Sequence, residues 1–256
     1  MSHNNDYLSN FGGLDANSLT HTLQLEDHEN ESQPKEAALI RMSHYYDYDQ
    51  LVSTLKTKQK CFTVLSLNCE SLNAKFDQIM VLIDNLSKSG CFFSAICLQE
   101  TWFNDNPDLS LFQLEHYNLI SQGKISSTRG GLVIYLRDIY NYKPLEIYTR
   151  SDTWEGQFIK IESDHLHKKI VIGNIYRPPR SLNENYETFL NELSPTLQKL
   201  QNFKHEVIIG GDFNIDLLKF HEKQTFSAFF DMITFAFFPS NNITHKTLTT
   251  PWKPHR

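Results

Sequence analysis

The chain has 256 residues, of which 40% are hydrophobic and 12% aromatic, and this is enough to build one sizeable core. Its formal net charge of -6 is modest and unevenly spread: residues 1–60 hold nine acids against five bases, so neither part has the bulk positive charge of a nucleic-acid clamp. No stretch approaches the roughly 18 uninterrupted apolar residues of a membrane span, and the opening MSHNNDYLSN lacks the basic and apolar regions of a secretory signal.

The first 60 residues form a polar segment that is rich in Asn, Ser, Asp, Glu and His and has no sustained apolar period. Such a segment cannot bury enough apolar surface to fold alone, so we expect most of it to be disordered. A short helix is expected near its end, in YYDYDQLVSTLK (residues 45–56). The composition changes at Cys61, which predicts one folded domain over residues 61–256.

The folded part opens with a strand, a helix and a second strand. Residues 62–67 and 92–98 are apolar runs typical of buried strands. Between them we expect an amphipathic helix, whose apolar spacing is carried by Phe76, Ile79, Met80, Ile83 and Leu86. This order favours two parallel strands joined by a crossover helix.

The middle of the chain holds short strand-like runs without helices between them, which predicts antiparallel hairpins. These runs cover residues 116–122, 130–136, 145–149, 156–162 and 168–176. A second amphipathic helix follows over residues 186–200, and Pro195 inside it predicts a kink or a break. A buried strand at 206–211 and an apolar helix at 225–238 complete an α/β sandwich with mixed sheets and no internal repeat.

The four cysteines form no C-x-x-C pair, and three of them flank or lie within apolar runs. We therefore expect reduced, mostly buried thiols in an intracellular protein, without a disulfide partner. Cysteine and histidine do not cluster in the sequence, so a zinc site is not indicated. The cysteines are Cys61, Cys69, Cys91 and Cys97.

Polar side chains collect where the buried strands end. Asn68 and Glu100 follow the first two strands, Tyr176 ends a third, and VIIGGDFNID places Asp212 and Asn214 after a fourth. In open α/β sheets, ligands gather beyond the carboxyl ends of the strands. Residues two apart in an extended segment face the same side, so Asp212 and Asn214 can face one centre.

This set of oxygen-bearing groups suits a hard cation such as Mg²⁺, which binds through one or two carboxylates together with substrate phosphate. Taken singly, each residue has a plain structural reading: Asn68 as a helix cap, Glu100 as a solvated loop acid, Tyr176 as a half-buried ring, and the Asp212–Asn214 pair as a turn. Four strand ends with the same chemistry favour a shared site over four separate turns.

The ordered motifs LSLNCESLNAKFDQI, AICLQETWF, RGGLVIYL, GNIYRPPR and IIGGDFNIDLL resemble the endonuclease domain of non-LTR (LINE-type) retrotransposons. That domain belongs to the endonuclease/exonuclease/phosphatase superfamily, together with the apurinic-site endonucleases. The likeness covers about residues 61–238. It implies a four-layer α/β sandwich with two mixed β-sheets and a Mg²⁺ or Mn²⁺ cofactor. It also implies DNA as the partner and hydrolysis of a phosphodiester bond in it, after which the cleaved strand primes reverse transcription in this family.

The resemblance also implies a role for each matching residue. Glu100 corresponds to the metal-binding acid, and Asn68 to an amide that helps to hold metal and phosphate. Tyr176 matches a tyrosine near the scissile phosphate. Asp212 matches the acid that orients and deprotonates the attacking water, a step that needs a base within hydrogen-bond reach. Asn214 matches an amide that fixes this geometry.

Three further side chains have two readings each. Arg177, in the Arg-Pro-Pro loop, and Arg129, in STRGG, could each place a guanidinium against phosphate, whose geometry the guanidinium fork matches. Either arginine could equally be part of a rigid exposed turn. Trp102 could line the substrate groove, although packing is slightly favoured.

The sequence departs from the family pattern near its end. The second Asp and the Ser-Asp-His of the family are not recognisable in ITHKTLTTPWKPHR, and His245 and His255 are poor substitutes. His165 and His167 are expected in a solvated hairpin turn. We therefore expect a C-terminally incomplete sandwich with impaired activity, because a missing acid–base group usually costs about 10²–10⁴ in rate.

Two other functions stay open at this point. One is a different phosphoesterase of the same superfamily, an apurinic-site nuclease or an inositol or lipid phosphatase. The other is a retroelement fragment that is not an enzyme or does not fold. Access to nuclear DNA is implied by the resemblance alone, since no basic import cluster is evident.

Overall fold

The computed structural model describes residues 46–103, 106–122, 130–147, 151, 153–162, 166, 168–179, 186–203, 205–215, 229 and 232. Disorder is predicted for most of residues 1–60, and residues 1–45 of that segment lie outside this set. Most of the helix predicted at 225–238 also lies outside it, although Phe229 and Met232 are both helical. None of the helices in the described ranges is long and apolar enough to cross a membrane.

The first described helix, α2 (Tyr48–Thr57), overlaps the helix expected at residues 45–56 and begins three residues later. Asp47 caps it, accepting a hydrogen bond from the Gln50 amide at 2.8 Å, while the Gln50 side chain accepts one from the Asp47 amide at 3.1 Å. This reciprocal capping box satisfies two amide groups that a helix start otherwise leaves unpaired.

The first sheet has the order β1-β2-β4-β3. The strands β1 (Val64–Asn68) and β2 (Ala95–Gln99) are parallel and are connected by α3 (Leu72–Lys88), so the predicted crossover is confirmed. The strand β4 (Leu132–Arg137) pairs antiparallel with β2 and with β3 (Tyr117–Gln122). A short 3-10 helix, η2 (Leu109–Phe112), precedes β3.

The second sheet has the order β5-β6-β7-β8. The strands β5 (Asn141–Pro144), β6 (Glu155–Glu162) and β7 (Ile170–Tyr176) are antiparallel neighbours. A parallel strand, β8 (Glu206–Asp212), completes the sheet after α4 (Tyr186–Asn202).

Two details of this sheet differ from expectation. Residues 145–147, the described part of the strand predicted at 145–149, are not in a strand. The strand β5 lies four residues earlier and is mostly exposed. As an edge strand it needs no apolar run, so an apolar search misses it. The helix α4 continues unbroken through Pro195.

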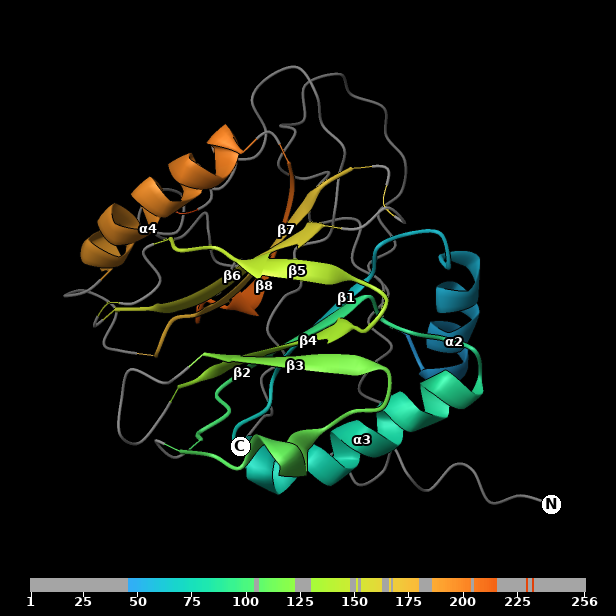
Figure 1. Cartoon of the computed structure of the whole chain (residues 1–256). Coiled ribbons are helices and arrows are strands. Elements are labelled where there is room, and N and C mark those ends of the chain that lie inside the picture. The colour runs from blue at the N-terminus through green and yellow to red at the C-terminus, as the bar shows by residue number, and fades with distance from the viewer. Residues whose placement is uncertain are drawn as a thin grey trace, which may run out of the picture. The chain divides into compact units, whose positions relative to one another are not determined.

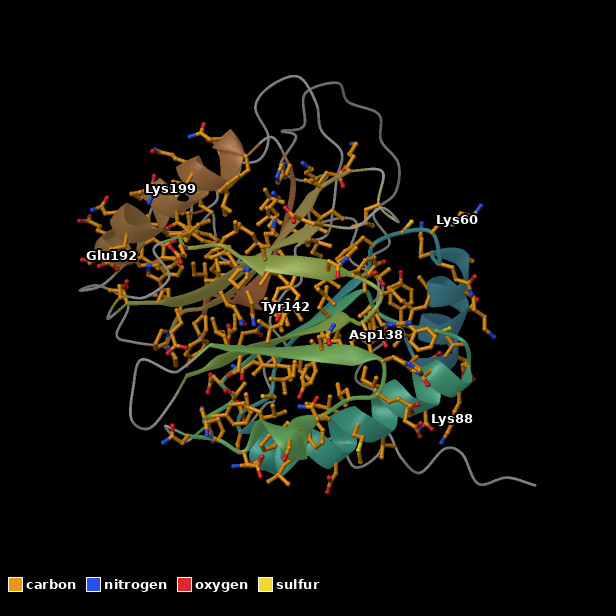
Figure 2. The ribbon with its side chains drawn as sticks, in the orientation of Figure 1. Lys60, Lys88, Asp138, Tyr142, Glu192 and Lys199 are labelled. Carbon is orange, nitrogen blue, oxygen red and sulfur yellow. The ribbon has the colours of Figure 1, made fainter. Side chains whose placement is uncertain are left out.

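The elements form four layers (Figure 1). The helices α2 and α3 cover the outer face of the first sheet, and α4 covers the outer face of the second. A third apolar cluster fills the space between the sheets and includes Cys97, Ile134, Ile159 and Ile172. Charged side chains such as Lys60, Lys88 and Lys199 are exposed on the outside (Figure 2). The predicted α/β sandwich with two mixed sheets is therefore confirmed.

The burial of the cysteines follows their position in these layers. Cys69, Cys91 and Cys97 are buried, and Cys61 is exposed. Burial raises the pKa of Cys97, between the sheets, to about 12. That thiol therefore stays protonated and unreactive at neutral pH.

Candidate active site

Four strands end beside one another at one edge of the sandwich. In the first sheet, Asn68 at the end of β1 pairs with Gln99 at the end of β2, and Glu100 follows. In the second sheet, Tyr176 at the end of β7 pairs with Asp212 at the end of β8. Because parallel strands end at the same edge and the two sheets face each other, the polar side chains at their tips meet there.

Asn68 joins the two acids of the site. Its Nδ2 donates to Glu100 Oε1 at 2.7 Å and to Asp212 Oδ2 at 2.9 Å, and so connects the two sheets. Both carboxylates are buried, with exposed fractions of 8% and 6%. Among the described residues neither carboxylate forms an ion pair. The two hydrogen bonds bring three residues predicted for the site together around one amide nitrogen.

Glycine is required directly before Asp212 for a steric reason. Gly211 lies opposite Ile175 in β7, and a Cβ atom at this position would collide with the Ile175 carbonyl oxygen. Gly211 also has a φ of 158°, at the limit of the region that other residues avoid. Only glycine lets the backbone of β8 come this close to β7, and this approach places Asp212 beside the end of β7.

Asn214 fixes the Asp212 carboxylate. The Asn214 amide donates to Asp212 Oδ1 at 3.0 Å, and Asn214 Nδ2 donates to Asp212 Oδ2 at 3.2 Å. The same Nδ2 donates to the Arg177 carbonyl at 2.7 Å. Asn214 has a left-handed backbone, with φ of 48°, which asparagine tolerates better than most residues. The predicted pair of acid and amide is therefore one hydrogen-bonded unit.

Arg177 lies beneath this unit and is only 3% exposed. One guanidinium nitrogen donates to the carbonyls of Phe213 and Asn214, at 3.1 and 3.3 Å, and the group lies 5.3 Å from the ring centroids of Tyr186 and Phe189. These contacts support the backbone of the Asp212 loop. They favour this supporting role over the alternative reading of Arg177 as a surface phosphate ligand.

Tyr176 presents a buried hydroxyl, since its side chain is only 1% exposed, and this hydroxyl lies beside the Glu100 carboxylate. Burial, and after it the charge of the nearby Glu100 carboxylate, raises the pKa of this hydroxyl above its ordinary value. The group therefore keeps its proton and is available as a donor. A protonated hydroxyl beside a buried carboxylate can donate to that carboxylate or to a bound ligand.

Glu100 stands on a tightly held turn. Glu100 and Trp102 have left-handed backbones, with φ of 55° and 51°. The amides of Thr101 and Trp102 donate to the carbonyls of Gly131 and Gly130, at 3.2 and 2.9 Å. The indole nitrogen of Trp102 donates to Glu100 Oε2 at 3.2 Å. Trp102 thus orients the carboxylate as well as packing beside it.

Glu155 was not predicted, although it lies at the same edge. It begins β6, pairs with Tyr176, and is 5% exposed. Its Oε2 accepts a hydrogen bond from the Gly131 amide at 2.7 Å, and a Cβ atom at Gly130 would collide with its Oε1. Glu155 therefore fixes the glycine pair that holds the Glu100 turn. An acid next to the apolar run of β6 was the available signal.

Five residues considered in the sequence lie outside the described ranges, and their predicted roles stay predictions. They are Arg129, His165, His167, His245 and His255.

The carboxylate and amide oxygens at this edge are suitable ligands for a hard cation. Buried carboxylates need a compensating positive charge. The Arg177 guanidinium is near enough to interact with the charge of Asp212, whereas Glu100 forms no ion pair among the described residues. Carboxylate and amide oxygens are the ligands that Mg²⁺ and similar cations take. As placed, Asn68 offers its nitrogen to the acids and its oxygen to the Glu70 amide at 3.1 Å. A half-turn of the amide would direct its oxygen to a cation and would give up the two hydrogen bonds to the acids, so the bonds described above belong to the site without a cation. Across the described residues, no group of three or more His, Cys, Asp or Glu side chains could hold a metal ion, so a cation would rely on substrate oxygens as well.

The model of the Endonuclease/Exonuclease/phosphatase family matches residues 65–256 of the chain. A comparison with curated protein sequences gave no significant match.

Among solved structures, AP endonuclease LMAP from Leishmania major has a TM-score of 0.53 and 13% sequence identity, and the match covers 79% of this chain and 78% of that one. This similarity shows a shared fold. An AP endonuclease from Archaeoglobus fulgidus matches with a TM-score of 0.47 and 18% identity, over 67% of this chain and 70% of that one. The mannosyl-6-phosphatase Bt3783 from Bacteroides thetaiotaomicron matches with a TM-score of 0.47 and 16% identity, over 66% and 70%.

Proposed function

The chain belongs to the endonuclease/exonuclease/phosphatase family of phosphoesterases, and we propose that within this family it is a magnesium- or manganese-dependent DNA endonuclease of LINE-type retrotransposon origin. The ordered motifs around Asn68, Glu100, Arg129, Tyr176 and Asp212 support the choice of substrate and origin. The observation that carries the proposal is the double hydrogen bond of the Asn68 amide to Glu100 and Asp212. It brings an acid from each sheet to one point.

In this proposal Asp212 is the general base. It takes a proton from a water molecule, which attacks the phosphorus while the bond from phosphorus to the leaving sugar oxygen breaks. Asn214 donates to both Asp212 oxygens and so limits the directions in which the carboxylate can accept that proton. Asn68 donates to the same carboxylate from the opposite sheet. A base fixed in this way loses little entropy when it meets the water.

The Tyr176 hydroxyl donates a hydrogen bond to a phosphate oxygen and keeps its proton. The hydroxyl lies beside the Glu100 carboxylate, and its raised pKa keeps it protonated at neutral pH. Such a donor becomes stronger as negative charge builds on the phosphate. Glu100 and Asn68 would hold the cation, which when bound stabilises that same charge.

A plasmid-nicking assay tests this function. We expect the protein to convert supercoiled DNA to nicked circles with Mg²⁺ or Mn²⁺, at the impaired rate expected without the family's Ser-Asp-His, and to lose this activity in EDTA. Replacing the base, in Asp212→Ala, should lower the rate by about 10²–10⁴. The matched control is Asp84→Ala, because Asp84 is an exposed acid on α3 that pairs with the exposed Lys88. Equal nicking by Asp212→Ala and the unaltered protein would refute the role of Asp212.

The same preparation separates DNA from the other substrates of the family. An abasic duplex and an inositol polyphosphate are incubated under the same conditions as the plasmid. If ordinary plasmid is cleaved at a rate comparable to that of the abasic duplex, the protein is an endonuclease that does not require an abasic site. Release of phosphate from the inositol compound without plasmid nicking would refute DNA as the substrate and leave the family membership untouched.

A further inference from the structure

The space between the two sheets changes from apolar to polar just before the candidate active site. Strand side chains alternate between faces, so Ser66, Asn174 and Gly210 share the inner faces of their strands with Asn68, Tyr176 and Asp212, two positions further on. Gln99 directly precedes Glu100 and also faces inward. We call Ser66, Gln99, Asn174 and Gly210 the polar layer.

Asn174 is the centre of the polar layer and is fully buried. It belongs to β7 of the second sheet, yet its Nδ2 donates to the carbonyls of Leu98 and Val133 in the first sheet, at 2.9 and 3.1 Å. Those two residues are partners across β2 and β4. Both hydrogens of the amide are therefore used to tie one strand of the second sheet to two strands of the first.

Gln99 completes the connection from the other side and is 1% exposed. Its Nε2 donates to Asn174 Oδ1 at 2.6 Å and lies 3.2 Å from Ser66 Oγ and 3.1 Å from the Cys97 carbonyl. Buried amides of this kind satisfy one another in only one relative placement of the sheets. An apolar pair would allow the sheets to slide, because dispersion contacts have no direction.

Gly210 sets how closely β8 approaches β1. A Cβ atom at this position would lie 3.0 Å from Ser66 Oγ and 3.1 Å from Ser66 Cβ, which is tighter than side chains normally pack. Two residues further along the same strands, Asn68 Nδ2 and Asp212 Oδ2 are 2.9 Å apart. The close contact of Ser66 with Gly210 therefore sets the spacing of β1 and β8 that allows the hydrogen bond between Asn68 and Asp212.

We propose that Gln99 and Asn174 are positioning residues of the active site, and that with Ser66 and Gly210 they fix the sheets in the one placement where Asn68 reaches both acids. The inference rests on the proposed function for its effect on rate. Its structural part, the placement of Asn68, stands by itself. None of the four residues touches the substrate in this account.

The test replaces the two amides together, in Gln99→Leu/Asn174→Leu, so that neither amide is left facing a lone partner. We expect a cooperative thermal melt and a fall in the single-turnover nicking rate of about 10²-fold, which is the usual effect of displacing reacting groups by about 1 Å. The half-saturating plasmid concentration should change little, because DNA contacts are not altered.

A second readout does not depend on activity. In protein labelled with ¹⁵N-asparagine, the side-chain amide resonance of Asn68, assigned through its loss in Asn68→Ala, reports its hydrogen bonds to the acids. This resonance should move in the double variant. A folded double variant with an unchanged nicking rate and an unchanged resonance would overturn the proposal. If the unaltered protein cuts no DNA, the proposed function fails, and the resonance still decides the positioning role.

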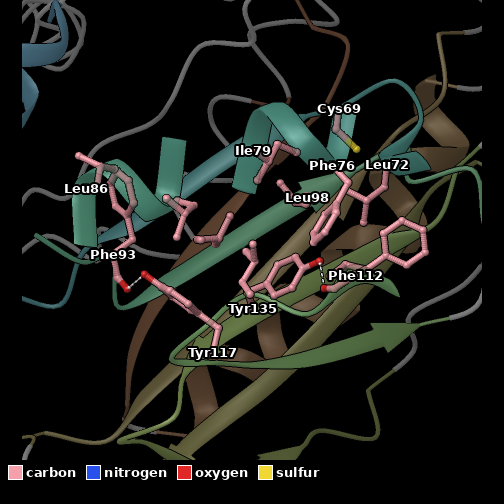
Figure 3. Packing of buried hydrophobic residues seen from close by; sticks show 14 of the residues in the cluster. Cys69, Leu72, Phe76, Ile79, Leu86, Phe93, Leu98, Phe112, Tyr117 and Tyr135 are labelled. Atoms are coloured by element: carbon pink, nitrogen blue, oxygen red, sulfur yellow. Dashed lines mark hydrogen bonds between the residues drawn. The ribbon is translucent and has the colours of Figure 1, made fainter. Parts of the chain in front are cut away.

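The matched control is Tyr117→Phe. The Tyr117 hydroxyl donates to the Phe93 carbonyl at 2.9 Å in the core between α3 and the first sheet (Figure 3), at the end of β2 opposite to the site. Its loss removes one buried hydrogen bond without touching the polar layer. We expect a lower melting temperature, an unchanged rate and an unchanged Asn68 resonance. A rate loss equal to that of the double variant would mean that general destabilisation explains both, and would overturn the proposal.

If the double leucine variant does not fold, a second pair keeps the question open to experiment. Gly210→Ala inserts a methyl group against Ser66, so we expect it to move the Asn68 resonance and lower the rate. Adding Ser66→Gly removes both atoms that the methyl group meets and should restore much of each. A Gly210→Ala protein with wild-type rate and resonance would overturn the proposal.

Discussion

Asn68 and Asp212 are separated by 144 positions in the chain, yet Nδ2 of the first donates to Oδ2 of the second at 2.9 Å. The bond joins β1 to β8 across the space between the sheets. Every other contact in the site either supports one of these two strand ends or adds a polar group beside them. The relationship therefore leads directly to a set of predictions.

Removing the Asn68 amide should impair catalysis more than folding. Asn68→Ala deletes the donor shared by Glu100 and Asp212, and losing one preorganised donor commonly lowers kcat by about 10²–10³. Asn68 is only partly buried, so we expect the thermal melt to remain cooperative. Plasmid nicking and circular dichroism measure the two effects. A variant that nicks at the original rate would contradict the bridging role.

Gly211 should tolerate no side chain. In Gly211→Ala the added methyl group meets the Ile175 carbonyl within the β7–β8 pair, and backbone atoms cannot move aside as a flexible side chain can. We expect a loss of about 3 kcal/mol or more in the free energy of unfolding, at the upper end for overpacking. Urea denaturation measures it. The control is Gly90→Ala, where an added Cβ atom meets nothing within 4 Å although φ is 72°, so about 1 kcal/mol is expected.

Glu155 should need its acceptor oxygen more than its charge. Glu155→Ala leaves the buried Gly131 amide without its acceptor, and this kind of loss costs about 1–3 kcal/mol. Glu155→Gln keeps an oxygen at the same distance along the side chain and should retain most of the stability. Urea denaturation of the two variants compares them. Equal stability of Glu155→Ala and the parent protein would contradict the role assigned to this hydrogen bond.

Stability should fall in alkali. Burial raises the pKa of Cys69, Cys97 and Tyr117 to about 12 and raises the pKa of Tyr135 and Tyr176 as well. These acids lose protons more readily in the unfolded chain, so their contribution is complete below the ordinary thiol value of 9.0 and is lost as pH rises through the folded values. Urea denaturation from about pH 8 to 12 should show a steady decline above about pH 9. A flat profile across this range would contradict the assigned burial of these groups.

The layers and the site followed from the sequence where a local pattern decides them. The apolar spacing through Phe76, Ile83 and Leu86 marks α3 because a helix must hide one face from water. Asp212 and Glu100 were found because each directly follows an apolar strand, and parallel strands share an edge. These inferences need only nearest neighbours in the chain.

What the sequence could not supply is the placement of one sheet on the other. The contact of Asn174 with Gln99 depends on inter-sheet register, so both amides read as unremarkable polar residues in apolar strands. Arg177 was read as having two equal roles because Arg-Pro-Pro is typical of exposed turns, whereas the guanidinium is buried against two aromatic rings. Glu155 was not predicted because its partner, the Gly131 amide, lies just before β4 of the other sheet.

The central claim is that Glu100 and Asn68 hold a cation beside the charge of Asp212, the base, and titration with Mn²⁺ followed by electron paramagnetic resonance tests it most directly. We predict saturable binding to the unaltered protein and at least a tenfold weaker affinity, about 1.4 kcal/mol, in Glu100→Gln and in Asp212→Asn. The exposed pair variant Asp84→Asn should bind as the parent does. Unchanged Mn²⁺ affinity in both site variants, with the fold intact, would contradict the account.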